Sequence, residues 1–272
     1  MEGFNYMSTK RSTTKEELAA KAKKHANDMV FMFEPEIKRS TEKTDIITTS
    51  LEIKKEKVEK VNFICLKTDT VSALFKYKAE INRDNYKFSK KCCILNFASF
   101  TQPGGNFIGG SMAQEEALCS ESILYNVLRN FKFAFYNANL NHKNNCMYEN
   151  RMLYSPDILF SRFYDNKENI ITTDVITCAA PNKSAAQRNY KVTNGENTKF
   201  LKSRIAFVLN VAAAKNADTL ILGAYGCGVF GQDPYEVARI FRSYLTGEYK
   251  YFSKVIFAVP DWKYEIFNKI LG

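Results

Sequence analysis

Short apolar runs separated by helix-like segments are the feature of this sequence that most restricts its fold. From Val61 onward, five runs are rich in β-branched and aromatic residues and have the length of strands. They are residues 61–66, 91–99, 173–180, 219–224 and 254–260. Several of these runs are apolar throughout, as is typical of strands that are covered on both faces. The alternation of strands and helices therefore predicts a three-layer α/β domain.

Five other segments have the spacing or the start signals of helices. They are residues 13–33, 114–130, 201–217, 234–246 and 262–271. Thr13 or Thr14 is expected to cap the first of them, because a side-chain oxygen can accept a bond from a free helical N–H group. The fourth has Asp233 in the capping position and Pro234 in the first turn, which is a strong start signal.

The remaining segments are predicted to be connections. Residues 34–60 are polar, and residues 131–170 show no firm periodicity. We therefore expect a helical extension and connection over residues 1–60 and the α/β domain over 61–272, together forming one structural unit. The apolar runs are too short to span a bilayer, and the N-terminus has no apolar core behind its positive charge. A soluble, intracellular protein, cytoplasmic or nuclear, is expected.

The charge and the cysteines restrict the kinds of partner. Lysine and arginine number 39 against 29 aspartates and glutamates, and the net charge of +10 favours anionic partners such as nucleic acid, phosphorylated metabolites or acidic polymers. Much of the lysine lies in mixed runs such as residues 51–60, which are typical of a solvated face. The seven cysteines lie mostly in apolar runs without metal-ligand spacing, and only His25 and His142 accompany them. No metal site and no cofactor are expected.

Two glycine-rich segments follow predicted strands. One is NFASFTQPGGNFIGG after Leu95, and the other is GAYGCGVFGQDP after Leu222. In an α/β sheet, ligands bind beyond the carboxyl ends of the strands, and converging N–H groups there make an anion site. Neither segment has the spacing of a P-loop or of a dinucleotide motif, and turn chemistry alone would explain either one. Two of them in a basic protein predict a diphosphate site.

Two adjacent carboxylates follow the first glycine segment. Gln114, Glu115 and Glu116 directly precede an apolar run with helical spacing. The helix dipole would explain one glutamate at a helix start. Adjacent residues of a helix point about 100° apart, so one glutamate can face a ligand while the other holds a neighbouring group. Glycosidic chemistry uses such a pair, with one carboxyl group acting on the leaving oxygen or on water.

These residues resemble those of a known family, the bacterial-type poly(ADP-ribose) glycohydrolases, which have a macrodomain fold. That family is marked by three glycines followed by Gln-Glu-Glu, and the corresponding residues here are Gly104, Gly105 and Asn106, then 114–116. Three further stretches are similar in the same order: MLYSPDILFSR (152–162), DVITCAAPN (174–182) and GAYGCGVFGQDP (223–234). The resemblance covers most of the chain and implies a three-layer α/β/α macrodomain with a mixed central sheet and an N-terminal helical extension.

The resemblance also implies roles for individual residues. Glu116 would be the general acid and base at the ribose–ribose O-glycosidic bond, and Glu115 would hydrogen-bond a hydroxyl of the departing ribose. Asn96 would orient a ribose, with a structural cap as the alternative. The implied substrate-binding residues are Asn96, Gly104, Gly105, Asn106, Gly109, Gly110, Gln114, Gly226, Cys227, Gly228, Val229 and Phe230, with Phe230 packing against a sugar. No metal is implied.

One residue departs from the family pattern. Asn106 stands where the family usually has a third glycine. Asparagine tolerates a positive φ better than most residues, so the turn is expected to survive, but the side chain adds bulk beside the scissile bond and narrows the expected range of substrates.

The expected function is hydrolysis of poly(ADP-ribose) to ADP-ribose, with ADP-ribose, the polymer and ADP-ribosylated proteins as partners. Two alternatives stay open at this stage. One is a macrodomain that binds ADP-ribose without cutting it, which would not need the two glutamates. The other is a hydrolase that removes single ADP-ribose units from protein or nucleic-acid acceptors. The basic charge leaves direct nucleic-acid binding open, and no membrane partner is expected.

Overall fold

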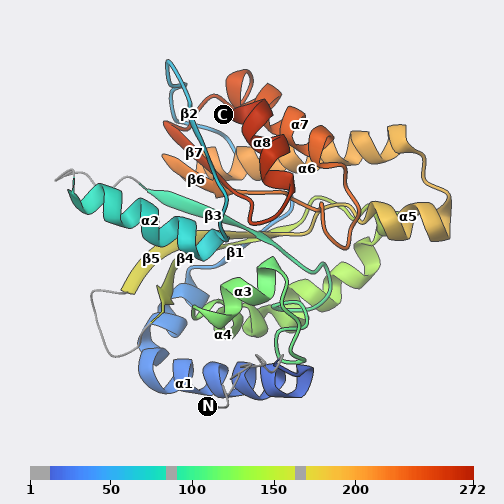
Figure 1. The fold of residues 1–272 in the computed structure, drawn as a ribbon. Coiled ribbons are helices and arrows are strands. Elements are labelled where there is room, and N and C mark those ends of the chain that lie inside the picture. The colour runs from blue at the N-terminus through green and yellow to red at the C-terminus, as the bar shows by residue number, and fades with distance from the viewer. Residues whose placement is uncertain (1–12, 84–90, 163–169) are drawn as a thin grey trace, which may run out of the picture.

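The computed structural model describes residues 13–83, 91–162 and 170–272. Its centre is a seven-stranded sheet with the order β1-β4-β5-β3-β6-β7-β2 (Figure 1). The strands are β1 (Asp45–Ile47), β2 (Asn62–Leu66), β3 (Cys92–Phe97), β4 (Met152–Ser161), β5 (Ile170–Cys178), β6 (Thr219–Leu222) and β7 (Lys254–Ala258). Strands β5, β3, β6, β7 and β2 are parallel, whereas β4 runs antiparallel to both β5 and β1. The sheet is therefore mixed, as expected.

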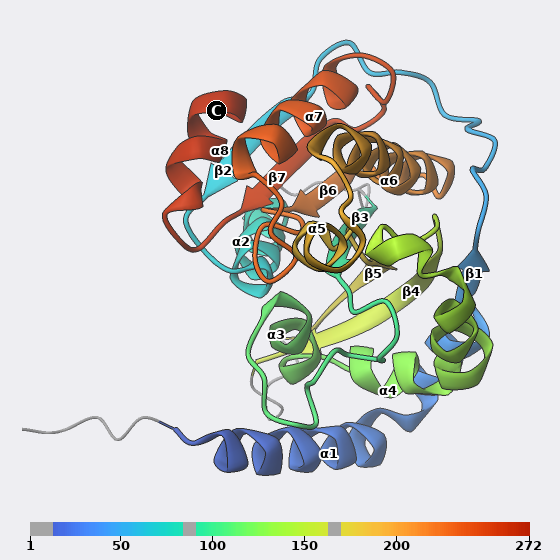
Figure 2. The same ribbon diagram turned by 90° about the vertical axis from the view of Figure 1, so that its right-hand side faces the viewer.

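Helices cover both faces of the sheet. They are α1 (Lys15–Glu42), α2 (Thr70–Arg83), α3 (Gln114–Ser120), α4 (Leu124–Leu128), α5 (Lys183–Tyr190), α6 (Asn194–Ala214), α7 (Pro234–Thr246) and α8 (Lys263–Leu271), with short helical turns η1 to η4 between Arg129 and Cys146. Helices α6, α7 and α8 pack on one face, and α2, α3 and α4 pack on the other (Figure 2). Helix α1 packs against α4 and β4. This is the predicted three-layer architecture.

The core explains why the strands read as continuous apolar runs. In β7, Val255 and Phe257 belong to the core beneath α6 to α8, while Ile256 and Ala258 belong to the core on the opposite face. All four side chains are almost fully buried. Burying one side chain of the size of valine or phenylalanine stabilises a fold by about 1.5–3 kcal/mol, so both faces of the strand contribute. No helix in the described ranges is long and apolar enough to cross a membrane.

The N-terminal segment is joined closely to the sheet. Thr14 caps α1 through a capping box, in which its hydroxyl accepts from the Glu17 N–H group and the Glu17 carboxylate accepts from the Thr14 N–H group. The helix runs beyond the predicted end, with non-helical geometry at Phe33 shortly before Pro35. Strand β1 then pairs with β4. The division of the chain at residue 60 stays a prediction. Residues 1–12 of the predicted N-terminal extension lie outside the described part.

The prediction that residues 131–170 form an irregular connection is wrong for its second half. Strand β4 occupies ten residues there, but a bulge between Ser155 and Ile158 interrupts its pattern, and Asp157 has a φ of 57°. The predicted helix over 114–130 is divided in two, because Ser122 forms a bridge to β4 between α3 and α4. Helices α2 and α5 were not predicted from the sequence.

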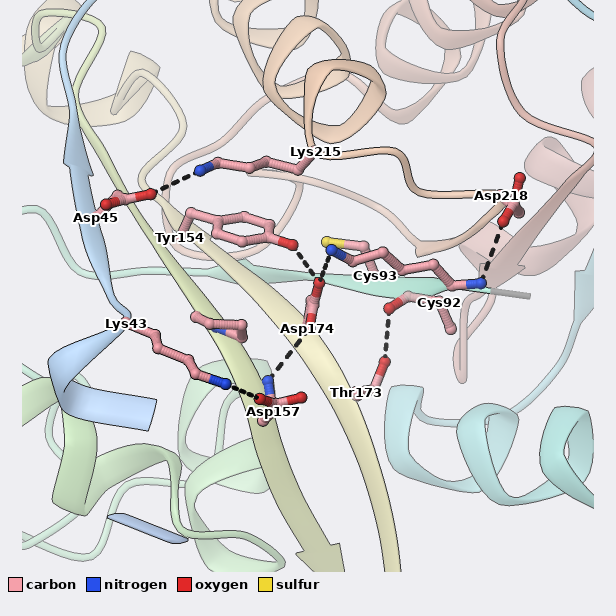
Figure 3. Close-up of polar contacts among 12 residues, drawn as sticks. Lys43, Asp45, Cys92, Cys93, Tyr154, Asp157, Thr173, Asp174, Lys215 and Asp218 are labelled. Atoms are coloured by element: carbon pink, nitrogen blue, oxygen red, sulfur yellow. Dashed lines mark hydrogen bonds and ion pairs between the residues drawn. The ribbon is translucent and has the colours of Figure 1, made fainter. Parts of the chain in front are cut away.

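A network of ion pairs and hydrogen bonds around the buried Asp174 supports the bulge of β4, near the start of β3 (Figure 3). The Asp174 carboxylate of β5 accepts hydrogen bonds from the Tyr154 hydroxyl and from the Asp157 N–H group, the latter at 3.2 Å. It also pairs with the Lys91 ammonium at 2.9 Å, and Lys43 pairs with Asp157 at 3.1 Å. Asp174 is buried, so its charge is compensated within the fold.

Candidate active site

The two adjacent glutamates begin α3, directly after the loop that follows β3. Glu115 and Glu116 are 3% and 6% exposed. Their position in the first turn means that the loop residues N-terminal to them supply nearby backbone N–H groups. A helix start is a favourable place for carboxylates because its first N–H groups are free and its dipole is positive there.

Backbone donors from the β3–α3 loop hold the Glu116 carboxyl group. Its Oε1 atom accepts a hydrogen bond from the Asn106 N–H group at 2.9 Å, and its Oε2 atom accepts one from the Ala113 N–H group at 3.1 Å. The two donors lie at either end of the same loop segment. The loop is therefore closed around this carboxyl group, and the group's direction is fixed by the backbone.

Neutral donors hold the Glu115 carboxyl group as well. Its Oε1 atom accepts from the Asn96 side-chain amide at 3.1 Å, and its Oε2 atom accepts from the Ser99 N–H group at 2.7 Å. Burial raises the pKa of Glu115 to about 8, and the charge of Glu116 adds to the rise, although the bonds from Ser99 and Asn96 lower the pKa. Glu115 therefore holds a proton at neutral pH.

Gly105 leaves open the space between the two carboxyl groups. A Cβ atom at this position would lie 2.5 Å from Glu116 Oε1 and 3.0 Å from Glu115 Oε2. The residue also has a φ of +62°, which disfavours any side chain. Glycine is required here for both reasons.

One cavity of about 640 Å³ brings both predicted glycine segments and both glutamates together. The predicted site residues that line it are Gly105, Asn106, Gln114, Glu115, Glu116, Gly226, Gly228, Val229 and Phe230. The cavity lies beyond the carboxyl ends of β3 and β6, where an α/β sheet binds its ligands. Its volume lies within the range of small-molecule sites, roughly 300–1,000 Å³.

Buried side chains hold the second glycine segment in place. Gly226 has a φ of +73°, and a Cβ atom there would lie 2.8 Å from the Ala180 Cβ atom. The buried amide of Gln232 donates to the Pro181 carbonyl at 2.8 Å and exchanges two hydrogen bonds with Asn197 of α6. The segment is thus fastened to α6 and to the segment that follows β5.

Asn96 lies beneath the cavity wall instead of lining it. Its side chain is fully buried at the end of β3 and donates to Glu115 and to the Thr177 hydroxyl, the latter at 3.3 Å. Its Oδ1 atom has no hydrogen-bond partner within the described part of the chain. Exchange of the amide oxygen and nitrogen positions would let a protonated Glu115 donate to Asn96 instead. The structure thus places Asn96 where it orients Glu115.

Four other predicted site residues lie next to the cavity without lining it. A Cβ atom at Gly104 would lie 2.8 Å from the Tyr125 ring, and one at Gly110 would collide with the backbone of α1. Gly109 lies under the Asn106 side chain, and the Cys227 thiol donates to the Tyr225 carbonyl. These positions shape the two loops, and their contact with a substrate stays a prediction.

Gln114 connects three elements while facing the cavity. Its Oε1 atom accepts from the Phe97 N–H group at 2.8 Å, and its Nε2 atom donates to the Leu95 carbonyl at 3.0 Å and to the Thr70 hydroxyl at 3.2 Å. The side chain therefore holds the start of α3 against the end of β3 and the start of α2. This positions both following glutamates.

Asn106 does not use the left-handed conformation that the sequence led us to expect. It is not among the described non-glycine residues with positive φ, so tolerance of positive φ is not needed there. Its exposed side chain donates to the Ser111 hydroxyl at 2.7 Å and passes over Gly109. The amide thus forms part of the rim, beside the Asn106 N–H group that holds Glu116.

Sequence reasoning missed several residues that line the cavity. Ser99 contributes a backbone N–H group to Glu115, and such a donor leaves no signal in the choice of side chain. Tyr225 also lines the cavity, with its hydroxyl fastened to the Cys178 carbonyl at 3.0 Å. In the described ranges, no group of three or more histidine, cysteine, aspartate or glutamate residues is arranged to hold a metal ion.

Comparison with known proteins agrees with this architecture. Residues 9–163 match the family model described as the microbial-type PARG catalytic domain. The structure is similar to that of poly(ADP-ribose) glycohydrolase (PARG) from Thermomonospora curvata, with 24% identity, a TM-score of 0.79 and coverage of 93% of this chain and 99% of that chain. PARG from Deinococcus radiodurans in complex with ADP-ribose is 30% identical, with a TM-score of 0.75 and coverage of 87% and 97%. No curated protein matches the chain.

Proposed function

The chain belongs to the family of microbial-type PARG catalytic domains, and we propose that it hydrolyses poly(ADP-ribose) with Glu116 and Glu115 as its reacting pair. Membership makes it a glycosidase whose substrate bond is the ribose–ribose O-glycosidic bond and whose product is ADP-ribose. The observation that carries the residue assignment is that both buried carboxyl groups face the one cavity that both glycine segments also line.

Glu116 acts as general acid and then as general base. Its carboxyl group gives a proton to the glycosidic oxygen as the bond from that oxygen to the anomeric carbon breaks, which leaves an oxocarbenium-like sugar. The resulting carboxylate then takes a proton from the water that adds to the anomeric carbon, and this restores the acid. The N–H groups of Asn106 and Ala113 hold both oxygens in place through the two steps.

Glu115 binds the departing ribose. Because burial raises its pKa to about 8, it is protonated at neutral pH and can donate a hydrogen bond to a sugar hydroxyl. A neutral Glu115 also avoids a second negative charge beside Glu116 at the moment when Glu116 loses its proton.

The second glycine segment holds the diphosphate. Glycines at 226 and 228 let backbone N–H groups approach phosphate oxygens, and Phe230 offers an apolar surface to a sugar. The ADP-ribose in the Deinococcus radiodurans complex supports a ligand of this class for the present cavity.

The N-terminal segment and the α/β domain form one structural unit in this proposal. Helix α1 packs against α4 and β4, and β1 extends the central sheet. We place the enzyme inside the cell, and its seven free cysteines support a reducing location. ADP-ribosylated proteins are proposed partners because they carry the polymer.

The reaction is tested by incubating the wild type and Glu116→Gln with poly(ADP-ribose) and measuring free ADP-ribose. We expect release by the wild type alone, with ADP-ribose binding retained in the variant, because glutamine keeps the shape but cannot transfer the proton. Glu121→Gln is the matched control, since Glu121 ends the same short helix and pairs with Arg162 at 2.5 Å, outside the cavity lining.

Two other outcomes would replace the proposal. Binding of ADP-ribose without release from any substrate would identify a module that reads ADP-ribose. Release from a protein carrying single ADP-ribose units, but not from the polymer, would identify a mono-ADP-ribosyl hydrolase.

A further inference from the structure

One corner of the molecule carries a large share of the excess positive charge. Residues 183–202 form α5, the turn after it and the first turns of α6. This stretch holds five basic residues, Lys183, Arg188, Lys191, Lys199 and Lys202, against the single acidic residue Glu196. It therefore supplies four units of the net charge of +10, whereas runs such as 51–60 mix both signs. We call residues 183–202 the basic corner.

The cations of the basic corner are available to a partner. Arg188, Lys191, Lys199 and Lys202 are exposed. None of the five takes part in an ion pair within the described ranges. The Glu196 carboxylate instead accepts from the Thr193 N–H group and hydroxyl, both at 2.8 Å, as the cap of α6. Glu236 of α7, which faces α6, accepts from the Thr198 hydroxyl.

The basic corner begins at the rim of the cavity. The Ser184 N–H group, in the first turn of α5, donates to the Phe230 carbonyl at 3.1 Å, and Phe230 lines the cavity. Figure 2 shows α5 beside the segment between β6 and α7 that forms this wall. The eight residues of α5 span about 12 Å, so Arg188, in its last turn, lies a short distance from the cavity rim.

An exposed aromatic ring lies among these charges. Tyr190 ends α5 and is 52% exposed, between Arg188 and Lys191 in the chain. Proteins that bind single-stranded nucleotide polymers combine basic grooves with aromatic rings on which bases stack. In a polymer with a diphosphate and an adenine in every unit, the diphosphates can pair with the cations and the adenines can stack on the ring.

We propose that the basic corner binds the outer units of poly(ADP-ribose), those beyond the unit in the cavity. This inference rests on the proposed function, since it assigns a second contact to the same substrate. Single-stranded nucleic acid has similar chemistry, but continuity with the cavity favours a polymer whose end enters that cavity. The corner then increases affinity for long chains without taking part in bond cleavage.

The test compares two triple variants with equal loss of charge. The first is Arg188→Gln, Lys191→Gln and Lys202→Gln, which removes three exposed cations of the corner. The control is Lys76→Gln, Lys78→Gln and Lys269→Gln, which removes three exposed cations of α2 and α8.

The readouts separate long from short substrates. For long poly(ADP-ribose) we expect KM of the corner variant to rise about three- to tenfold and the slope of log KM against log salt to fall by about 2, because each lost phosphate contact removes about 0.7 from a single-strand slope. We expect kcat to stay at the wild-type value, and KM for a two-unit oligomer, which has a single outer unit, to rise less than KM for the long polymer. An unchanged KM and salt slope, or an equal loss in the control, would overturn the proposal.

A direct measurement of polymer binding tests the basic corner independently of the proposed hydrolysis. Labelled poly(ADP-ribose) is titrated onto both triple variants in the Glu116→Gln background, so a weaker complex with the corner variant is visible even if the wild type releases no ADP-ribose. Single-stranded DNA of matched charge is the competitor. If the DNA binds as tightly as the polymer, and the corner variant weakens both equally, the corner is a nucleic-acid surface and the assignment to the polymer fails.

Discussion

Buried carboxylates lie at both ends of β3, and their partners differ. At the cavity end, Glu115 and Glu116 accept hydrogen bonds only from backbone N–H groups and an asparagine amide among the contacts of the described residues. At the other end, Asp174 pairs with the Lys91 ammonium. It also accepts a hydrogen bond from the Tyr154 hydroxyl (Figure 3). Carboxyl groups are buried at both ends of β3, but within the described ranges only Asp174 has a cation, Lys91, that compensates its charge.

The difference separates the proposed reacting site from a structural one. A buried carboxyl group with neutral donors is desolvated without full compensation, and burial raises the pKa of Glu115 to about 8. Glu115 therefore keeps its proton at neutral pH and can donate a hydrogen bond into the cavity. The pair of Asp174 and Lys91 keeps both charges satisfied and fastens β5 to the start of β3.

The largest expected effect is that of Glu116→Gln on catalysis. Loss of a general acid and base lowers kcat by about 10²–10⁴-fold. The free energy of unfolding should fall by only about 1–3 kcal/mol, because one of the two backbone N–H donors meets the amide NH₂ group where it had a carboxyl oxygen. Steady-state kinetics and urea unfolding measure the two quantities. A variant with wild-type kcat would remove Glu116 from the reaction.

Gly105→Ala is expected to have the next largest effect. The added methyl group would lie between the two carboxyl groups, and the left-handed conformation adds about 1–2 kcal/mol of strain. ADP-ribose affinity and kcat should each fall by roughly tenfold or more, since about 1.4 kcal/mol corresponds to tenfold. Calorimetric titration and kinetics measure them.

Gly228→Ala is the matched control for that substitution. Gly228 lines the same cavity, but a Cβ atom there would meet no atom within 4 Å, and its φ is not positive. We expect near-normal activity. Equal losses in both variants would show that glycine at 105 has no special relation to the carboxyl pair.

Asp174→Asn should lower stability and leave kcat nearly unchanged, whereas Glu116→Gln is expected to lower kcat strongly. Removing this charge leaves Lys91 without its partner, and because Lys91 is partly exposed we expect a loss of about 2 kcal/mol of unfolding free energy, below the 3–5 kcal/mol typical of fully buried pairs. The kcat of the folded protein should stay within about twofold of wild type, since each tenfold change in rate requires about 1.4 kcal/mol at the reacting centre. A large fall in kcat with unchanged stability would contradict the structural role of this end.

A further effect, confined to stability, is the pH dependence contributed by Glu115. Between pH 4.5 and about 8 the folded state holds the Glu115 proton and the unfolded state does not, so stability falls as pH rises through this window. The contribution is fully present below pH 4.5, and the fall amounts to about 1.4 kcal/mol per pH unit at most.

The Glu115→Gln variant isolates this contribution. Glutamine does not titrate, so the stability of the variant relative to wild type should rise between pH 5.5 and 7.5, as measured by urea unfolding. A difference that stays constant with pH would show that the pKa of Glu115 is not raised.

Local patterns predicted those elements whose signals lie within one segment of the chain. The cap of α7 at Asp233 and the cap of α1 at Thr14 are as expected, because a side-chain oxygen and a free N–H group meet within a few residues. Helix α6 begins earlier than predicted, at a capping box of Thr193 and Glu196 that apolar spacing did not reveal. Strand β4 was missed because Pro156 and Asp157 interrupt it at a bulge.

The sequence by itself determined five of the seven strands in the described sheet, the two glycine segments and the carboxylate pair, because apolar runs, glycines and adjacent glutamates act through local backbone chemistry. Only the tertiary structure decided that the pKa of Glu115 is raised. The donors to Glu115 come from Asn96 and Ser99, and Asn96 is itself held by Thr177 of the neighbouring strand. A pKa depends on burial and on such partners, which come together only when β3, β5 and α3 are packed.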